Sequence, residues 1–288
     1  MDIKVRKIST DWKVLPNGLT WYFIGQPKTG KSTQASQWSK NGADGCLLID
    51  TDLGSDFVDK ANTVTVTCLN TPTRPQMFEG KQIVEKGTPL TEVIPNDERD
   101  HYHRTGDSVG EPMEVYSMVE VYYWLKENLK KLPYDTIAID TLDHINRWIE
   151  DEVCDERGQV AMGDASSWGQ DWAQARKKNL DIIRKFQRLC KSLNKNLVLV
   201  SHAKPTSVTD GKSQLGPQLP GGLAIGVTAS ADVIGYTTAS KEDGKFYISF
   251  QSYDERAVGS RLKPLAQKVL DFDYDSVMNE ILKFKEKE

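Results

Sequence analysis

The sequence lacks the long apolar runs and the excess of one charge that mark several large protein classes. No apolar run approaches the roughly 20 residues of a membrane-spanning helix, and the N-terminal segment MDIKVRKISTDWKV has no apolar centre like that of a signal peptide. We therefore expect a cytoplasmic protein with no membrane partner. The 288 residues include 37 Lys and Arg and 41 Asp and Glu, a formal net charge of −4. This balance excludes a protein that coats nucleic acid through bulk charge, but it is compatible with a local basic groove.

Cysteine is scarce and its spacing excludes a zinc site. The four cysteines form no CxxC pair, and no histidine lies at zinc-ligand spacing from any of them. They are Cys46, Cys68, Cys154 and Cys190. Three of them lie in apolar strand-like or helical patterns, which is typical of small buried thiols in a reducing compartment.

Short apolar runs alternate with helical patterns along the chain. The expected strands are 19–24, 46–50, 64–69, 136–140, 197–201, 232–236 and 246–251. Runs that are apolar on both faces favour a parallel sheet covered by helices. Helical periodicity extends over 115–132, from Trp168 to 193, and over 274–287, where it predicts a closing amphipathic helix. We predict an α/β fold, with a mostly parallel sheet flanked by helices, as a single domain over 1–288.

Two stretches do not fit this regular pattern. Residues 70–112 are polar and interrupted by five prolines, so we predict a surface insertion there. Residues 206–222 are rich in Gly, Pro, Ser and Gln between two expected strands. Long irregular loops within compact domains often carry function.

The strongest chemical signal is the segment GQPKTGKS at 25–32, which matches the phosphate-binding pattern GxxxxGK followed by Ser or Thr. It follows an expected strand and precedes an expected helix, whose N-terminus would add partial positive charge to the inward-pointing N–H groups of the loop. We predict that Lys31 neutralises the β- and γ-phosphates of ATP and that the Ser32 hydroxyl binds Mg²⁺. The predicted nucleotide-binding residues are Gly25, Gln26, Pro27, Lys28, Thr29, Gly30, Lys31, Ser32 and Thr33.

Carboxylates follow two of the expected strands. Asp140 ends the run TIAID, and we predict that it holds Mg²⁺ from a strand next to the phosphate loop; capping of the following helix is the alternative. Asp143 is expected to be favoured by the dipole of that helix. Asp50 and Asp52 end the strand LLID, and Asp52 is the predicted base that orients the attacking water. In the alternative interpretation, both simply begin a turn with Gly54.

The order of these segments resembles the RecA-like P-loop ATPases over roughly residues 19–270. The segments are GQPKTGKST, LLIDTD, TIAIDTLD, SSWGQDW and LVLVSHAKP. The chain looks closest to phage-encoded nucleotide-binding and single-strand annealing ATPases, the RecA-core and AAA-type phage proteins. The resemblance implies a RecA-like core, ATP bound with Mg²⁺ between the subunits of a ring or filament, and a role on single-stranded DNA in phage recombination, annealing or replication. It also implies the host bacterial cytoplasm as the location and a single-strand binding protein as a candidate partner.

The resemblance extends to individual positions around the γ-phosphate. RecA-like proteins usually carry Glu where this chain has Asp52, so the shorter side chain would have to approach the water more closely. Hydrolysis is therefore expected to be slow or differently arranged. His202 follows the run LVLVS, where the family often has a polar residue that senses the γ-phosphate. A structural histidine is the alternative.

The resemblance also points to contacts with DNA and with a neighbouring subunit. The segments 155–168 and 206–222 match the family's DNA-facing loops; apart from Trp168 they are poor in aromatic residues, and an ordinary flexible loop is the alternative. Near the C-terminus, the family places basic residues on the neighbour's γ-phosphate. The candidates here are Arg256, Arg261 and Lys263, with Arg256 ahead because it lies at a turn, and solvated surface residues are the alternative.

Two other functions fit the sequence less well. A P-loop kinase would close an arginine-rich lid, for which Arg74, Arg99 and Arg104 of the insertion are candidates. A nucleotide-dependent switch would need little turnover, which agrees with Asp at the base position. Stimulation of hydrolysis by DNA separates the leading hypothesis from both.

Overall fold

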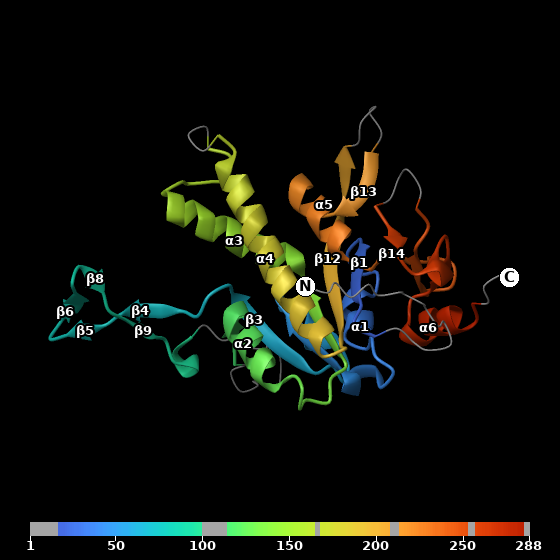
Figure 1. The fold of residues 1–288 in the computed structure, drawn as a ribbon, viewed down its shortest axis with the longest axis horizontal. Coiled ribbons are helices and arrows are strands. Elements are labelled where there is room, and N and C mark those ends of the chain that lie inside the picture. The colour runs from blue at the N-terminus through green and yellow to red at the C-terminus, as the bar shows by residue number, and fades with distance from the viewer. Residues whose placement is uncertain (1–16, 100–113, 165–167, 208–212, 253–256, 285–288) are drawn as a thin grey trace, which may run out of the picture.

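The computed structural model describes residues 17–99, 114–164, 168–207, 213–252 and 257–284. The strands of its main sheet are β1 (Thr20–Gly25), β2 (Cys46–Asp50), β3 (Thr63–Cys68), β10 (Tyr116–Ser117), β11 (Thr136–Asp140), β12 (Asn196–Ser207), β13 (Ser213–Pro217), β14 (Val233–Ala239), β15 (Phe246–Ser249), β16 (Gly259–Ser260) and β17 (Val269–Asp271). Their order is β10-β3-β2-β11-β12-β1-β14-β15-β17, with β13 beside β12 and β16 beside β14 (Figure 1).

The sheet is parallel from β10 through to β14. The last two strands, β15 and β17, and the side strands β13 and β16 pair antiparallel. The predicted α/β fold with a mostly parallel sheet is therefore confirmed. Every expected strand is present within two residues at its start, but β12 continues to Ser207, well beyond the predicted end at 201.

Helices cover both faces of the sheet. They are α1 (Lys31–Ala35), α2 (Met118–Asn128), α3 (Leu142–Arg157), α4 (Gln170–Ser192), α5 (Gly221–Ser230) and α6 (Tyr274–Leu282). Short 3-10 helices span Gly42–Gly45, Ser55–Phe57, Asn96–Glu98 and Lys263–Leu265. Strand β1 shows how the layers form, because successive side chains of a strand point to opposite faces: Tyr22 and Ile24 pack with α2, α3, α4 and α5, whereas Trp21 and Phe23 pack with α1 and α6.

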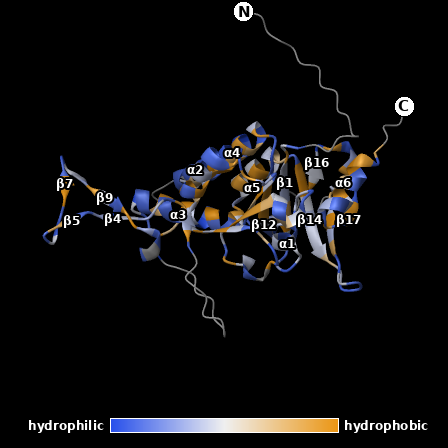
Figure 2. Cartoon of the chain, turned by 90° about the horizontal axis from the view of Figure 1, so that it is seen from below, coloured by the Kyte–Doolittle hydropathy of each residue, from blue (hydrophilic) through white to orange (hydrophobic). Residues whose placement is uncertain are grey.

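The two cores differ in character. The core on the α1 and α6 side contains an aromatic cluster, in which Trp38 lies 5.2 Å from Trp21, 4.7 Å from Phe23 and 5.9 Å from Phe272 between ring centroids. The other core is mainly aliphatic and larger. Figure 2 shows the hydrophobic residues gathered where the helices face the sheet. These packed layers fix the carboxyl ends of β1, β2, β11 and β12 at one edge of the sheet.

The predicted insertion forms a projecting arm of three small hairpins. Its strands are β4 (Thr73–Pro75), β5 (Met77–Phe78), β6 (Lys81–Gln82), β7 (Val84–Glu85), β8 (Thr88–Pro89) and β9 (Thr91–Val93), paired β4–β9, β5–β6 and β7–β8. The arm extends from the β3 side of the sheet, away from β1 and α1 (Figure 1).

Both arginines of the arm that the structure describes form ion pairs. Arg74 pairs with Glu92 and Glu98, and Arg99 pairs with Glu120 in α2 at 2.8 Å. These pairs do not support the arginine lid of a kinase. Arg104, the third candidate for that lid, lies outside the described residues.

The closing helix is present, but α6 ends at Leu282 and the last residues of the predicted span 274–287 lie outside the described residues. Over the described ranges, none of the helices combines the length and the apolar character needed to cross a bilayer. The extent of a single domain over 1–288 stays a prediction.

Candidate functional site

The segment between β1 and α1 folds as a tight phosphate loop. Lys28 and Gly30 have positive φ angles of 64° and 77°, which wind the backbone around a small space. Gly25 leaves no room for a side chain, since a Cβ there would lie 2.1 Å from Thr237 Oγ1 and 2.8 Å from its carbonyl oxygen. The Thr29 hydroxyl bonds to Gln26 O at 2.9 Å and to Thr237 Oγ1 at 2.7 Å. Hydrogen bonding and close packing therefore hold the loop in the shape that the motif requires.

The helix after the loop is shorter than the motif suggests. Helix α1 has five residues, and the Ser36 hydroxyl bonds back to Thr33 O at its end. A single turn carries little of the macrodipole that a long helix would supply. The expected contribution of the helix N-terminus is therefore small, and the loop N–H groups together with Lys31 remain to bind phosphate.

Lys31 is buried at the centre of this site. It is 6% exposed, and its ammonium group donates to Gln26 O at 2.7 Å. Burial lowers the pKa of Lys31, whereas the charges of Asp140 and Asp143 favour the protonated form. The ammonium group is thus bound to the loop backbone and lies in the electrostatic field of carboxylates from other strands and helices.

Asp140 has the features of a cation ligand. It is 3% exposed at the end of β11, and its Oδ1 atom has no hydrogen-bond partner in the described structure. Burial raises its pKa to about 7, a hydrogen bond from Ser32 lowers it, and the charge of Asp52 raises it. The N-cap of α3 is Thr141, so Asp140 does not cap that helix. An orphaned buried carboxylate oxygen beside a hydroxyl fits Mg²⁺, which offsets negative charge there.

The metal would need further ligands from the nucleotide. Among the described residues no group of three or more His, Cys, Asp or Glu side chains could hold a metal ion. Mg²⁺ commonly binds through one or two protein groups plus phosphate oxygens and water. Ser32 and Asp140 therefore fit a cation that arrives with the nucleotide.

The strand order corrects one expectation about Asp140. Strand β12 pairs with both β1 and β11, so Asp140 lies two strands from the phosphate loop and not on the adjacent one. In between, β12 places His202 opposite Gly25 in the ladder. The separation concerns the backbones of the strands, since the Ser32 and Asp140 side chains are hydrogen-bonded to each other.

Asp50 and Asp52 do form the turn that the alternative interpretation proposed. Asp50 accepts hydrogen bonds from Asp52 N at 3.1 Å and from the backbone N and the hydroxyl of Ser55. Asp52 Oδ1 accepts from Gly54 N at 2.9 Å. Burial and the neighbouring Asp50 raise the pKa of Asp52, and the Gly54 N–H lowers it. Asp50 is committed to the turn, while Asp52 stays close enough to act electrostatically on Lys31 and Asp140.

His202 is held by a residue whose role the sequence did not reveal. Its backbone N–H donates to Asp143 Oδ2 at 2.9 Å, and its Nδ1 lies 3.3 Å from the same oxygen. Asp143 is 5% exposed, so it is a buried hydrogen-bond acceptor for β12 and not only a negative charge at the N-terminus of α3. Next to it, Tyr22 donates to Ser201 Oγ at 2.9 Å.

The predicted basic residues of the C-terminal region are only partly described. Arg256 lies outside the described residues. Arg261 pairs with Asp232 Oδ1 at 3.0 Å and donates to Ala229 O at 2.8 Å, near the start of β14. Lys263 begins a 3-10 helix. Since β14 runs parallel to β1, Arg261 lies at the sheet edge opposite its own phosphate loop, and action on a neighbouring subunit stays a prediction.

The comparisons with known proteins agree with this geometry. A family model described as an AAA domain matches residues 17–273. The chain belongs to this AAA domain family. Among curated proteins, none matches the chain. The AAA domain is a nucleotide-binding domain of the P-loop ATPase type, as the phosphate loop and Asp140 indicate.

The two segments predicted to face DNA take different forms in this AAA domain. Residues 155–157 complete α3, and Gly158 ends it with a φ of 63°; residues 165–167 lie outside the description. Part of the second segment is paired strand, because Ala203–Ser207 of β12 pair with Ser213–Pro217 of β13. Residues 208–212 lie outside the description, and α5 starts at Gly221. Within the expected irregular loop 206–222, residues 206–207 and 213–217 are therefore strands that extend the sheet, and residues 218–220 are irregular.

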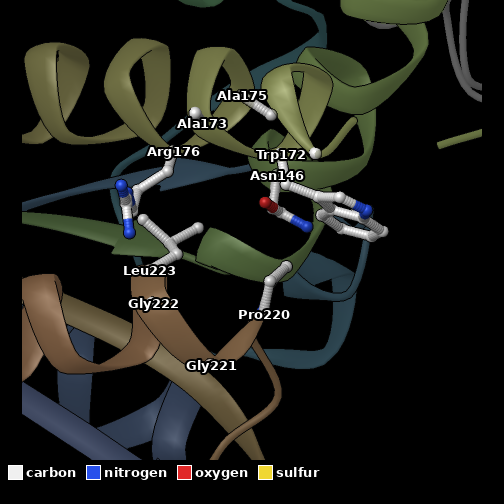
Figure 3. Close-up of a pocket in the computed structure, with 10 residues that line it drawn as sticks. Asn146, Trp172, Ala173, Ala175, Arg176, Pro220, Gly221, Gly222 and Leu223 are labelled. Atoms are coloured by element: carbon white, nitrogen blue, oxygen red, sulfur yellow. The ribbon is translucent and has the colours of Figure 1, made fainter. Parts of the chain in front are cut away.

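A pocket of about 280 Å³ lies between the first turns of α4 and the start of α5, and Pro220, Gly221 and Gly222 at the end of the second segment line it. Arg176 extends from α4 toward the start of α5, while the ring of Trp172 extends to the side of the pocket, against Gly163 (Figure 3). A Cβ on Gly222 would lie only 2.7 Å from Arg176 Nη1, so the guanidinium group rests against the helix N-terminus. Trp172 was quoted from the sequence only as the last residue of SSWGQDW, and Arg176, which follows one helical turn later, was not named.

Proposed function

We propose that this AAA domain hydrolyses ATP with Mg²⁺ and couples hydrolysis to binding of single-stranded DNA, in phage recombination, annealing or replication. The observation that carries this proposal is the pocket formed by Trp172, Arg176 and the start of α5. Its lining includes Pro220–Gly222 from the end of the segment 206–222, and the ring of Trp172 lies against Gly163 of the segment 155–168; these two segments match the DNA-facing loops of RecA-like proteins.

The chemistry of the pocket suits a nucleic-acid backbone. Helix α5 spans ten residues and has no side-chain cap, so its first N–H groups favour an anion. The Arg176 guanidinium at the same place adds a full positive charge, and the two together suit a phosphate group. Trp172 is 41% exposed and Trp168 is 90% exposed, so aromatic rings for stacking bases lie beside this phosphate site. The pocket therefore adds the ring of Trp172 to that of Trp168, the aromatic residue noted in the segments 155–168 and 206–222.

In the proposed reaction, a water oxygen attacks the γ-phosphorus while the bond from that phosphorus to the bridging oxygen breaks. Asp52 accepts the proton of the water, the bridging oxygen leaves with ADP, and inorganic phosphate forms. Lys31 neutralises charge on the β- and γ-oxygens, and His202 senses the γ-phosphate from β12. Ser32 and Asp140 would hold Mg²⁺, which would supply positive charge to the phosphate oxygens.

Assembly completes the proposal. ATP is bound between the subunits of a ring or filament, where a basic residue of the neighbour (Arg256, Arg261 or Lys263) reaches the γ-phosphate. Such a residue supplied in trans raises phosphoryl-transfer rates by roughly 10³–10⁵. A single-strand binding protein is a further proposed partner.

The test is steady-state ATP hydrolysis with and without single-stranded DNA. Lys31→Ala is the blank, Arg176→Ala removes the proposed phosphate contact, and Arg184→Ala is the matched control on the same helix outside the pocket. We expect several-fold stimulation that is lost in Arg176→Ala and at high salt, because counterions compete for phosphate. Arg184→Ala is expected to keep the stimulation. Tight ATP binding without any stimulation would overturn the DNA role.

That negative result would favour a nucleotide-dependent switch. One observation supports this second candidate: Asp52 already uses Oδ1 to accept from Gly54 N, which leaves a single oxygen for the water. A switch would bind ATP and change its contacts with a partner while it turns over slowly.

A further inference from the structure

The order of the strands fixes the direction in which a bound nucleotide must lie. Asp140 and Asp52 follow β11 and β2, so the γ-phosphate end points to that side of β1. The phosphate loop cradles the α- and β-phosphates, and the nucleoside extends from the α-phosphate. We therefore expect the nucleoside to extend toward the other side of β1, where β14 is its neighbour and β15 and β17 follow.

A hollow of about 270 Å³ lies on that side, next to the phosphate loop. It is lined by Gln34, Lys245, Phe246, Asp271, Phe272 and Asp273. Pockets that enclose whole small ligands start at roughly 300 Å³, so this space suits part of a nucleotide. None of these six residues was among the predicted site residues.

Two contacts connect the hollow to the loop. A Cβ built on Gly30 would lie 2.8 Å from two ring carbons of Phe246, so the aromatic ring stands directly against the phosphate loop. Gln34 N donates to Gly30 O at 2.9 Å, one helical turn from the motif. Phe246 is half-buried, which leaves part of its ring open to the hollow.

We propose that this hollow holds the nucleoside of a purine nucleotide, with the base stacked on Phe246. The surrounding polar groups are rich in hydrogen-bond acceptors, namely the carboxylates of Asp271 and Asp273 and the amide oxygen of Gln34. Asp271 lies 3.9 Å from the Lys245 ammonium, and Asp273 Oδ1 accepts from Ser276 N at 2.7 Å. Acceptors in this arrangement suit a base with an exocyclic amine and the hydroxyls of a ribose. A two-ring base offers the larger face for stacking.

This inference rests on nucleotide binding at the phosphate loop and not on the proposed DNA role. It is tested with three probes in the presence of Mg²⁺: ATP, CTP and inorganic tripolyphosphate. Their affinities are measured by titration calorimetry on the wild-type chain, on Phe246→Leu, which keeps an apolar side chain but removes the ring, and on Phe246→Tyr, which keeps the ring. Phe78→Leu, in the arm, is the matched control.

The wild-type chain is expected to bind ATP more tightly than CTP and at least about tenfold more tightly than tripolyphosphate, since base–aromatic contacts contribute at this level. Phe246→Leu is expected to weaken ATP binding by about tenfold and to leave tripolyphosphate binding unchanged. Phe246→Tyr and Phe78→Leu are expected to bind all three probes like the wild type.

Three results would overturn the inference. Equal weakening of ATP and tripolyphosphate in Phe246→Leu would mean that the ring only supports Gly30. Equal wild-type affinity for ATP and tripolyphosphate would mean that the hollow does not hold the nucleoside, and equal affinity for ATP and CTP would exclude purine preference. Failure of every probe to bind the wild type is a distinct outcome, because it would overturn the phosphate site itself.

Discussion

The backbone N–H of His202 and its imidazole Nδ1 both face one carboxylate oxygen of Asp143, at 2.9 and 3.3 Å. This oxygen ties the middle of β12 to the first turn of α3, 59 residues away along the chain. The strand that carries the predicted γ-phosphate sensor is therefore fixed to the helix that follows the predicted metal ligand.

Removal of the Asp143 carboxylate is expected to destabilise the fold. Asp143→Ala leaves the half-buried His202 N–H without its acceptor, which costs about 1–3 kcal/mol of unfolding free energy. Asp143→Asn keeps an oxygen at this place and should lose less. Urea denaturation of both variants measures the difference, and equal losses would show that the hydrogen bond contributes nothing.

Removal of the Thr51 hydroxyl is also expected to destabilise the fold, since this group joins the ends of β2 and β11. Its hydroxyl donates to Thr141 O at 2.9 Å and accepts from Thr141 N at 2.7 Å, and both residues are buried. Thr51→Val leaves two backbone groups unsatisfied and should lower the unfolding free energy by about 2–4 kcal/mol. Thr51→Ser keeps the hydroxyl and serves as the control in the same denaturation experiment. A Val variant as stable as the Ser variant would contradict this account.

Gly25→Ala is expected to abolish tight nucleotide binding. The added Cβ collides with both the hydroxyl and the carbonyl oxygen of Thr237, so the loop must move. The double variant Gly25→Ala with Thr237→Ala removes only the hydroxyl and should restore part of the affinity. Gly42→Ala is the control, because it has nothing within 4 Å and should cost only the roughly 1–2 kcal/mol of its positive φ without changing affinity. Full affinity of Gly25→Ala would contradict the packing.

Because the Cys190 thiol is buried, the unfolding free energy is expected to fall as the pH rises through the alkaline range. Burial raises the pKa of Cys190 to about 12, while an unfolded chain has a thiol pKa of about 8.5. The neutral thiol therefore contributes stability that is fully present below about pH 8.5 and is lost as the pH rises toward 12. Between pH 7 and 10, the unfolding free energy of the wild type should fall more steeply than that of Cys190→Ala. Parallel slopes for the two chains would sink this prediction.

Features encoded in neighbouring residues were predictable from the sequence. The strands are short apolar runs, so their positions and the α/β class follow from local patterns. The phosphate loop is likewise a contiguous motif, and Asp140 follows from the strand that it ends. The length of α1 was less accessible, because the Ser36 hydroxyl bond to Thr33 O at its end is not part of the motif.

Features that depend on distant segments were not predictable. The position of β12 between β1 and β11 is a property of strand pairing, so the two-strand separation of Asp140 from the loop was missed. The contact of Asp143 with His202 has the same origin. The hairpin of β12 with β13 was hidden by its Gly, Pro and Ser content, since backbone pairing in the sheet outweighs weak local β-propensity. Arg176 and Gly222 likewise meet only because α4 packs beside α5.

Strand β12 has a mechanical consequence, because it runs without interruption from the centre of the sheet to the base of the β12–β13 hairpin. From His202 to Ser207 the strand covers about 17 Å at roughly 3.3 Å per residue. The flanking strands hold the first part of β12 on both sides, whereas β13 is the partner of its outer part. If β12 tilted at His202, the residues of the hairpin would be displaced in proportion to their distance from His202, so those at Ser207 would move farthest.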